Sequence, residues 1–174
     1  MADDRSPSPE AGSPTPRERY GPLLRAMVRV AASRAGAWWF IHVSSRIDPL
    51  LLRRTNGRLS LAPGWPVLLL RHTGAKSGVV RETPLLYATD GPRLVVIASK
   101  GGALRNPAWY HNLTAHPECD VIAKGRSGRY RARESRGEER ERLWDVVTHL
   151  YPGYITYQAR AGERRIPLVV LEPA

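Results

Sequence analysis

The 174-residue sequence has little cysteine, lysine or phenylalanine, and the single cysteine limits the class of protein most. Cys119 alone cannot form an internal disulfide framework, and no group of Cys and His residues has the spacing of zinc ligands. We therefore expect a reducing, cytoplasmic setting and no bound metal. No apolar run is uninterrupted for long enough to span a bilayer. A chain of this length can bury a core as one domain with extensions, without disulfide or metal crosslinks.

Lysine occurs only three times, although the net charge is +11 and the pI is near 10.6. Arginine carries the excess, yet Lys76 and Lys100 both lie in glycine turns. A basic chain attracts phosphate groups, nucleic acid or anionic lipid, and its positive charge does not distinguish among these partners. The sequence contains no helix-turn-helix motif and no RNA-reading motif, so we expect no nucleic-acid partner.

The first 65 residues differ in composition from the rest of the chain. Residues 1–19 are rich in Pro, Ser and charge without an apolar segment, which predicts a disordered tail and neither a signal peptide nor a helix. Residues 20–65 are predicted to form a basic, helical, amphipathic extension, with a Trp-Trp-Phe cluster near its middle. This extension either packs on its own domain, which we favour, or contacts the inner face of the plasma membrane through residues 23–45.

From Pro66 to the C-terminus, short apolar runs alternate with turn residues, which is typical of strands. We expect strands at residues 67–73, 79–89, 94–99, 119–124, 129–135 and 166–171, and helices at 107–115 and 137–150. Strands and helices do not alternate regularly, so a mainly antiparallel α+β sheet or barrel carrying helices is favoured over a Rossmann fold. We expect one domain over residues 66–174.

Residues 98–113, ASKGGALRNPAWYHNL, combine a strand end, a glycine turn and a helix start. Asn106 is a good N-cap, and the following proline suits the first helical position. Free N–H groups at this helix start, together with Lys100, would attract a flat, anionic ligand. The alternative is an ordinary strand-turn-helix junction in which Trp109 and Tyr110 belong to the core.

Two further segments suggest a site, each with a structural alternative. The turn GAKSG at residues 74–78 is either an anion-binding nest or a plain hairpin tip, and it is not a Walker loop. Tyr151, Tyr154 and Tyr157 are spaced by three residues, so helical geometry would place them on one side. They either line a pocket or form a structural aromatic cluster.

These motifs resemble a known family. The sequences TGAKSGVVRETPL, ASKGGALRNPAWYHNL and YPGYITYQAR followed by RRIPLVVLEP are similar to the deazaflavin-dependent nitroreductase family, the F420-dependent quinone and nitroimidazole reductases of mycobacteria. The resemblance covers about residue 66 to the C-terminus. It implies a split β-barrel of about six strands with surrounding helices, related to barrels that bind flavin mononucleotide (FMN). It also implies coenzyme F420 as the hydride carrier and a homodimer.

The resemblance further implies which residues form the site. The family's cofactor contacts fall on Ala75, Lys76, Ser77, Arg81, Glu82, Thr83, Ile97, Ala98, Ser99, Lys100, Ala108, Trp109, Tyr110, His111, Asn112 and Tyr154. Its substrate contacts fall on Ser99, Tyr151, Tyr154 and Tyr157. Of these, Tyr151 or Ser99 would act in catalysis by donating a hydrogen bond to an oxygen of a quinone-like or nitroaromatic acceptor.

Two other functions stay open at this point. The first is an oxidoreductase of related barrel architecture that uses FMN instead of F420. The second is a non-catalytic cationic module that binds nucleic acid or stores the deazaflavin. Binding of the two cofactors would distinguish the first alternative, and salt-sensitive DNA binding without cofactor affinity would favour the second.

Overall fold

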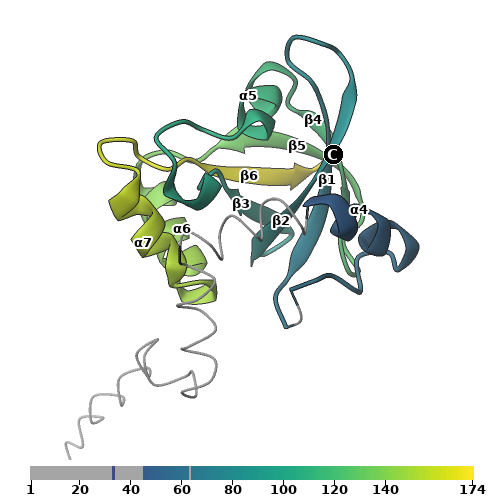
Figure 1. Cartoon of the computed structure of the whole chain (residues 1–174), viewed down its shortest axis with the longest axis horizontal. Helices are drawn as coiled ribbons and strands as arrows, with labels where there is room; N and C mark the ends of the chain where they lie inside the picture. Colours follow the sequence, from purple (N-terminus) through teal and green to yellow (C-terminus); the bar gives the residue numbers. More distant parts are fainter. Residues whose placement is uncertain (1–32, 34–44, 63) are drawn as a thin grey trace, which may run out of the picture.

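The computed structural model describes residue 33, residues 45–62 and residues 64–174. The predicted tail over residues 1–19 and most of the predicted amphipathic extension lie outside the described residues. Figure 1 shows the described part as a β-barrel with helices on its outside. Within it, no helix is both long enough and apolar enough to cross a membrane.

Six strands and five helical segments follow one another along the described chain. They are α4 (Ser45–Arg54), β1 (Val67–Thr73), β2 (Val80–Asp90), β3 (Arg93–Ile97), the 3-10 turn η2 (Lys100–Gly102), α5 (Ala108–Ala115), β4 (Glu118–Ile122), β5 (Gly128–Glu134), α6 (Gly137–Leu150), α7 (Gly153–Arg160) and β6 (Leu168–Pro173). Each predicted strand overlaps one observed strand, and the predicted helix at residues 137–150 coincides with α6.

The six strands form a closed antiparallel barrel in the order β1-β2-β3-β6-β5-β4. Closure comes from the pairing of β1 with β4, in which Leu70 lies opposite Val121. The predicted split β-barrel with surrounding helices is therefore confirmed. Each of the six strands has a hydrogen-bonded partner on both sides, so the barrel of the described residues has no open edge.

Strand β3 shows why a continuous apolar run occurs in this fold. Successive side chains of a strand point to opposite faces. Leu94 and Val96 point into the barrel, whereas Val95 and Ile97 pack outside it against residues of α6 and α7. Strand β6 has the same arrangement. Both faces of these strands are covered, so alternation with polar residues is absent.

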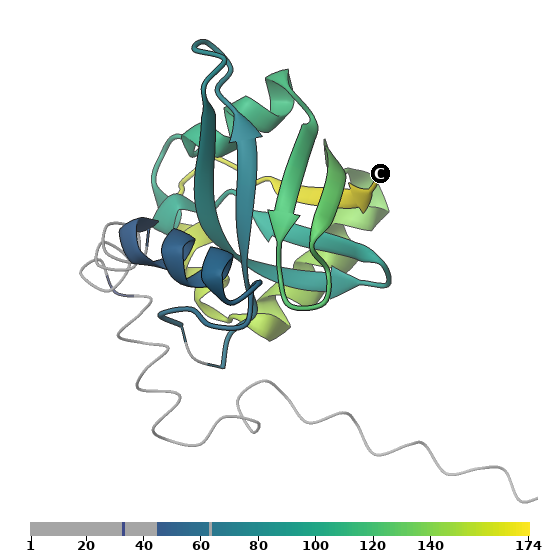
Figure 2. The ribbon, with the colours of Figure 1, turned by 90° about the vertical axis from the view of Figure 1, so that its right-hand side faces the viewer.

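Helix α4 packs on the outside of the barrel against β1 and β2, as Figure 2 shows. Its Leu52 is fully buried beside Val67 and Leu69 of β1. The turn after α4 lies against the chain between β4 and β5, because a Cβ on Gly57 would come within 2.5 Å of the Ala123 carbonyl carbon. Residues 45–62 therefore share a core with the barrel.

The structure corrects some predicted boundaries. Strand β3 ends at Ile97 rather than at residue 99, because Ser99 already turns back and its N–H donates to the Ile97 carbonyl. Strand β6 begins at Leu168 rather than at residue 166, after Pro167, which has no N–H to give to a β-ladder. Pro107, not Asn106, is the N-cap of α5.

The exposed face of β5 carries three arginines. Arg129, Arg131 and Arg133 are exposed, but each forms an ion pair with an acidic residue of a neighbouring element. Arg133 pairs with Glu139 of α6 and with Glu172 of β6. The positive charge of this strand is therefore largely balanced.

Candidate active site

The turn after β3 has an unusual backbone. Lys100, Gly101 and Gly102 all have positive φ, at +48°, +64° and +83°. Gly102 packs so closely on α7 that a Cβ there would lie 2.7 Å from the Tyr157 carbonyl oxygen. Ser99 is nearly buried, whereas the Lys100 side chain is exposed. The turn thus presents a cation to solvent from a rigid support.

Helix α5 follows this turn and supplies five predicted cofactor contacts. No side chain caps its N-terminus. Trp109 is only 6% exposed and belongs to the core inside the barrel, as the structural alternative for this residue stated. Tyr110 is half-buried and donates its hydroxyl hydrogen to Glu134, at 2.6 Å, while Ala108 and His111 are exposed. The side chains of this helix therefore face different surroundings.

A buried chain of polar groups joins α5 to the β1–β2 hairpin. The Ala75 N–H donates to Oδ1 of Asn112 at 2.9 Å, which orients the Asn112 amide. The Nδ2 group of Asn112 then faces Nδ1 of His72 at 3.0 Å, and Nε2 of His72 lies 3.0 Å from the Thr83 hydroxyl. Because Nδ1 must accept, the proton of the neutral ring is on Nε2. Burial, and then the charge of Arg81, lowers the pKa of His72 to about 4.

The three predicted contacts on β2 do not share one face. Thr83 points toward His72, whereas Glu82 forms ion pairs with Arg71 at 3.3 Å and Arg53 at 3.5 Å. Strand alternation causes this separation. Side chains from only one of the two faces of β2 can point toward the same ligand.

The three tyrosines of the predicted substrate site contact one another. Tyr151 follows α6 as its C-cap, and Tyr154 and Tyr157 lie on α7. Neighbouring ring centroids are 5.1 to 6.1 Å apart, and the hydroxyl oxygens of Tyr151 and Tyr157 are 3.4 Å apart. Each ring is at least nine-tenths buried, and this burial raises the pKa of all three phenols. They are therefore neutral hydrogen-bond donors at physiological pH.

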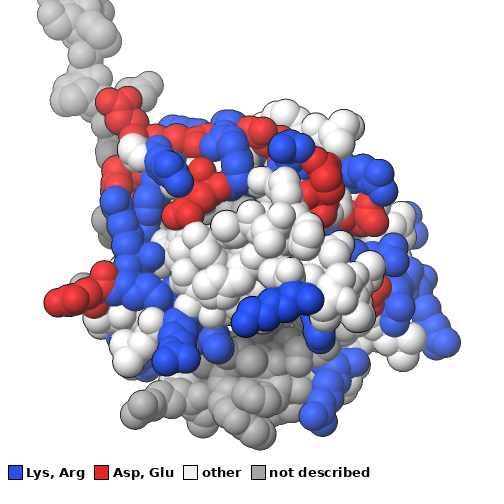
Figure 3. Space-filling model, turned by 90° about the horizontal axis from the view of Figure 1, so that it is seen from above, with Lys and Arg blue, Asp and Glu red and all other residues white. Residues whose placement is uncertain are grey.

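The two glycine turns carry cations without acidic partners. Lys76, Arg81, Lys100 and Arg105 are exposed, and none forms an ion pair with a carboxylate of the described residues. In the view onto the end of the barrel that carries α5, acidic side chains gather mainly along one border, while Lys and Arg extend over more of the face (Figure 3). An anionic ligand would find uncompensated positive charge at both turns.

The two turns are bonded to different parts of the α5 segment. The hairpin tip is bonded to Asn112 in the middle of the helix, and the turn at Lys100 is connected through Arg164 to Asn106 just before the helix starts. The helical residues from Ala108 to Asn112 rise by roughly 6 Å. Figure 1 shows α5 between the two loops. A ligand with separated anionic and planar parts matches this spacing.

Sequence reasoning missed two residues of this site. His72 lies in an apolar strand pattern one residue before the motif TGAKSGVVRETPL, and only the fold brings it to Asn112. Arg164 belongs to the sequence RRIPLVVLEP that carries the resemblance, but nothing in that string distinguishes it from Arg165. Arg164 contacts the turn after β3, whereas Arg165 pairs with Glu141 on the surface.

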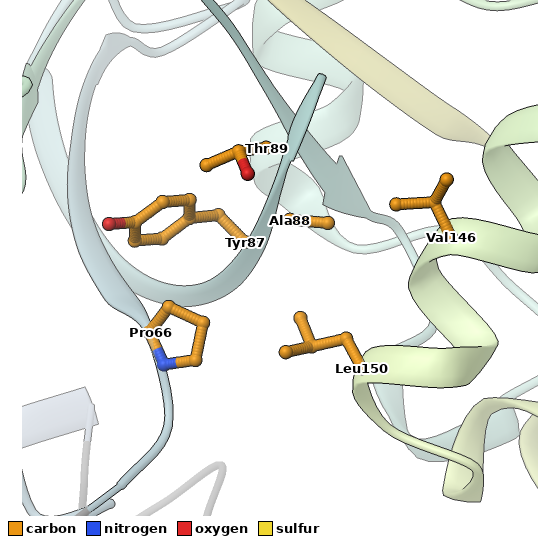
Figure 4. A pocket seen from close by; sticks show the side chains of 6 residues that line it. All are labelled: Pro66, Tyr87, Ala88, Thr89, Val146 and Leu150. Carbon is orange, nitrogen blue, oxygen red and sulfur yellow. The ribbon is translucent and has the colours of Figure 1, made fainter. Parts of the chain in front are cut away.

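A separate hollow of about 290 Å³ lies between β2 and α6. Tyr87, Ala88 and Thr89 line it from β2, and Val146 and Leu150 face them from α6 (Figure 4). None of the predicted site residues borders it. Among the described residues, no group of His, Cys, Asp and Glu side chains is arranged to hold a metal ion.

Solved structures define the class to which this architecture belongs. One, an F420-H2 dependent reductase (FDR-A), is 38% identical, with a TM-score of 0.57, and the match covers 62% of this chain and 94% of that chain. Another, described as a domain-swapped dimer, is 35% identical with a TM-score of 0.60, and the match covers 75% of this chain and 96% of that chain. The chain thus shares its fold with split-barrel reductases.

The family is shown by sequence. The model of the family described as F420H(2)-dependent quinone reductase matches residues 44–173. The F420H(2)-dependent quinone reductase Rv1261c of Mycobacterium tuberculosis is 40% identical over 131 residues, which are 72% of this chain and 87% of the relative. The chain belongs to the F420H(2)-dependent quinone reductase family, a family of oxidoreductases with F420H2 as the hydride donor. The family match begins before α4, so it includes more than the motifs after Pro66.

Proposed function

We propose that this chain reduces quinones with F420H2, and that its cofactor lies along α5 between the two cationic glycine turns. The observation that carries this location is the pair of turns whose cations form no ion pair with a described carboxylate, one bonded to the middle of α5 and the other to the residue just before its N-cap. The phosphate and oligoglutamate tail of F420 would face Lys76 and Arg81. The planar deazaflavin would lie near Ser99 and Lys100.

The residues of the site fit this group. Exposed side chains of the hairpin tip can pair with an anionic tail without first breaking an ion pair. Lys100 has a positive φ, which a residue with a side chain rarely adopts, and its side chain is exposed. Such strained positions concentrate at ligand sites.

When bound, F420H2 supplies the hydride, and the protein contributes orientation, exclusion of water and stabilisation of charge. As a quinone accepts the hydride, negative charge grows on its oxygen. A neutral phenol, Tyr151 in our proposal, would donate a hydrogen bond to that oxygen, with the Ser99 hydroxyl as the other candidate donor. The raised pKa of Tyr151 keeps its proton in place for this role.

Anaerobic titration tests the proposal. Tryptophan quenching would be followed with F420 and separately with FMN, and the F420H2 complex would then be mixed with menadione or with a nitroimidazole. We expect F420 binding, no FMN binding and return of deazaflavin absorbance with menadione. The nitroimidazole shows whether nitroaromatic acceptors are also reduced.

Lys76→Ala tests the position of the anionic tail, with Lys124→Ala as the matched control. Both lysines are exposed and lie in turns, but Lys124 lies between β4 and β5. Loss of one charge-assisted contact should weaken F420 binding about tenfold in the first variant only. Equal Kd values for both variants would contradict the proposed location, and absence of F420 binding in the wild-type protein would contradict the function.

We also propose a peripheral membrane contact through residues 23–45, for which the support is the basic amphipathic pattern of the sequence. Replacing Arg25 and Arg29 by Gln in the full chain should weaken binding to anionic vesicles about thirtyfold, because each arginine near such a surface contributes about 1 kcal/mol. Arg129→Gln with Arg131→Gln provides the control. Unchanged sedimentation with vesicles would remove the membrane proposal.

A further inference from the structure

The guanidinium of Arg164, a residue between α7 and β6, donates hydrogen bonds to a single segment. Its Nε donates to the Ala103 carbonyl at 2.8 Å, and its Nη2 donates to the Ser99 carbonyl at 2.9 Å. Its Nη1 donates to the Ala98 carbonyl at 3.1 Å and to Oδ1 of Asn106 at 2.6 Å. All four acceptors lie between the end of β3 and the start of α5.

These bonds determine where the opposite side of the turn points. The Ser99 carbonyl accepts from Arg164 and also from the Gly102 N–H. In a trans peptide the C=O and the following N–H point in opposite directions. The Lys100 N–H is therefore directed away from the Arg164 guanidinium. The carbonyl side of the turn faces the protein, and the Lys100 N–H and side chain face outward.

The acceptors explain why this residue is an arginine. A guanidinium has five N–H donors in a rigid plane, whereas a lysine ammonium has three donors on a flexible stem. Four neutral acceptors surround the side chain of Arg164, and this arrangement matches the donors of a guanidinium. Because no carboxylate of the described residues forms an ion pair with Arg164, its charge adds to that of Lys100.

We propose that Arg164 is a positioning residue for the cofactor site: it holds the turn at Ser99 to Gly102 in the conformation that presents the Lys100 N–H and ammonium group to an anionic, planar ligand. This inference rests on the proposed function, in which F420 is that ligand. Arg164 acts through the backbone of the turn and requires no contact with the cofactor.

Two neighbouring arginines make the inference testable. Arg165 is exposed and paired with Glu141, so Arg165→Ala changes the net charge equally without touching the turn. Arg140 is buried and donates to the Ile166 carbonyl at 2.9 Å, so Arg140→Ala removes a buried arginine that supports the segment just before β6 and not the turn. The first variant controls for charge and the second for stability.

The full-length wild-type protein would be compared with Arg164→Ala, Arg164→Lys and both controls. Amide hydrogen exchange without cofactor reports on the turn, F420 titration gives Kd, and thermal unfolding gives stability. We expect faster exchange at Gly102 and Ala103 and an about tenfold higher Kd in Arg164→Ala, with an intermediate Kd in Arg164→Lys. Millimolar guanidinium should restore part of the affinity of Arg164→Ala.

The controls separate positioning from general support of the fold. Arg140→Ala should lower Tm while its Kd for F420 stays within about twofold of wild type, and Arg165→Ala should resemble wild type in Kd and exchange. A wild-type Kd in Arg164→Ala, or equal losses of affinity in Arg164→Ala and Arg140→Ala, would overturn the inference about Arg164 but not the proposed function. A wild-type protein that binds no F420 would overturn the proposed function and this inference together.

Discussion

His72 is a residue whose role follows from its partners and not from its place in a motif. It is 3% exposed, and both ring nitrogens have neighbours that require one tautomer. A proton added to Nδ1 would point at the Asn112 amide hydrogens. The neutral ring is therefore part of the structure that holds the hairpin tip against α5.

We predict that His72 makes stability depend on pH. Its folded-state pKa of about 4 lies below the ordinary 6.5, so the unfolded chain binds the proton more tightly. The stabilisation is complete above pH 6.5 and is lost as pH falls from 6.5 toward 4, to a total on the order of 3 kcal/mol. Urea unfolding at pH 7 and pH 4.5 would measure this loss.

His72→Gln provides the comparison, because glutamine does not titrate in this range. This variant should be less stable than wild type at pH 7 but should lose less stability on acidification. His116→Gln, which changes an exposed histidine, should follow the wild-type pH profile. A His72→Gln protein with the same loss as wild type between the two pH values would show that other groups cause the acid sensitivity.

At the scale of elements, the position of the turn after β3 depends on two other segments, namely helix α7 and the loop that follows α7. Gly102 contacts the backbone of α7, and Arg164 comes from the next loop. The same short helix carries Tyr154 and Tyr157. The cationic turn and the tyrosine cluster are therefore supported by one element, which couples the geometry of the proposed cofactor and acceptor sites.

Gly102→Ala should disturb this support. The added Cβ would lie 2.7 Å from the Tyr157 carbonyl oxygen and 2.8 Å from the Arg160 Cβ, at a φ of +83°. We expect a loss of about 2 kcal/mol in the free energy of unfolding, measured by urea unfolding. F420 affinity should also fall.

Gly125→Ala is the matched control for backbone strain. Its φ is +68°, and a Cβ there would meet nothing within 4 Å. It should lose about 1 kcal/mol from strain alone and keep its F420 affinity. If both variants lost the same stability and affinity, the contact with α7 would be unimportant for the site.

At the scale of the whole molecule, the charge is not uniformly distributed. The arginines of β5 and several others form ion pairs with acidic residues, while the cations at the two glycine turns form none with a carboxylate in the described part of the chain. A net charge of +11 therefore does not by itself identify a nucleic-acid or lipid partner. The local excess of positive charge at the two glycine turns is more specific than the net charge.

A ligand that binds the folded chain should stabilise all of it. At a free F420 concentration about 100 times Kd, linkage predicts about 2.7 kcal/mol, or a rise in Tm of roughly 5–10 °C for a protein of this size. Differential scanning fluorimetry with F420, and with FMN at the same concentration, would measure the two shifts. A larger shift with FMN would favour the alternative cofactor.

Much of the fold could be predicted from the sequence. Apolar runs and glycine turns are local properties, and they located the six strands and α6 within two residues. The three motifs of the resemblance identified the family. Boundaries were less accurate at the end of β3, where the Ser99 N–H turns back to the Ile97 carbonyl, and at the start of β6, where Pro167 has no N–H for the β-ladder.

The arrangement of the site depends on the tertiary structure. Sequence patterns alone did not show that Glu82 turns away from Thr83 toward Arg71, or that Trp109 lies in the core. They also did not show that Arg164, and not Arg165, bonds to the turn. Local sequence determined which segments form strands, turns and helices, because backbone preferences and side-chain periodicity act over a few residues. Packing between distant segments decided which charged and polar groups meet, because those contacts exist only once the barrel has closed.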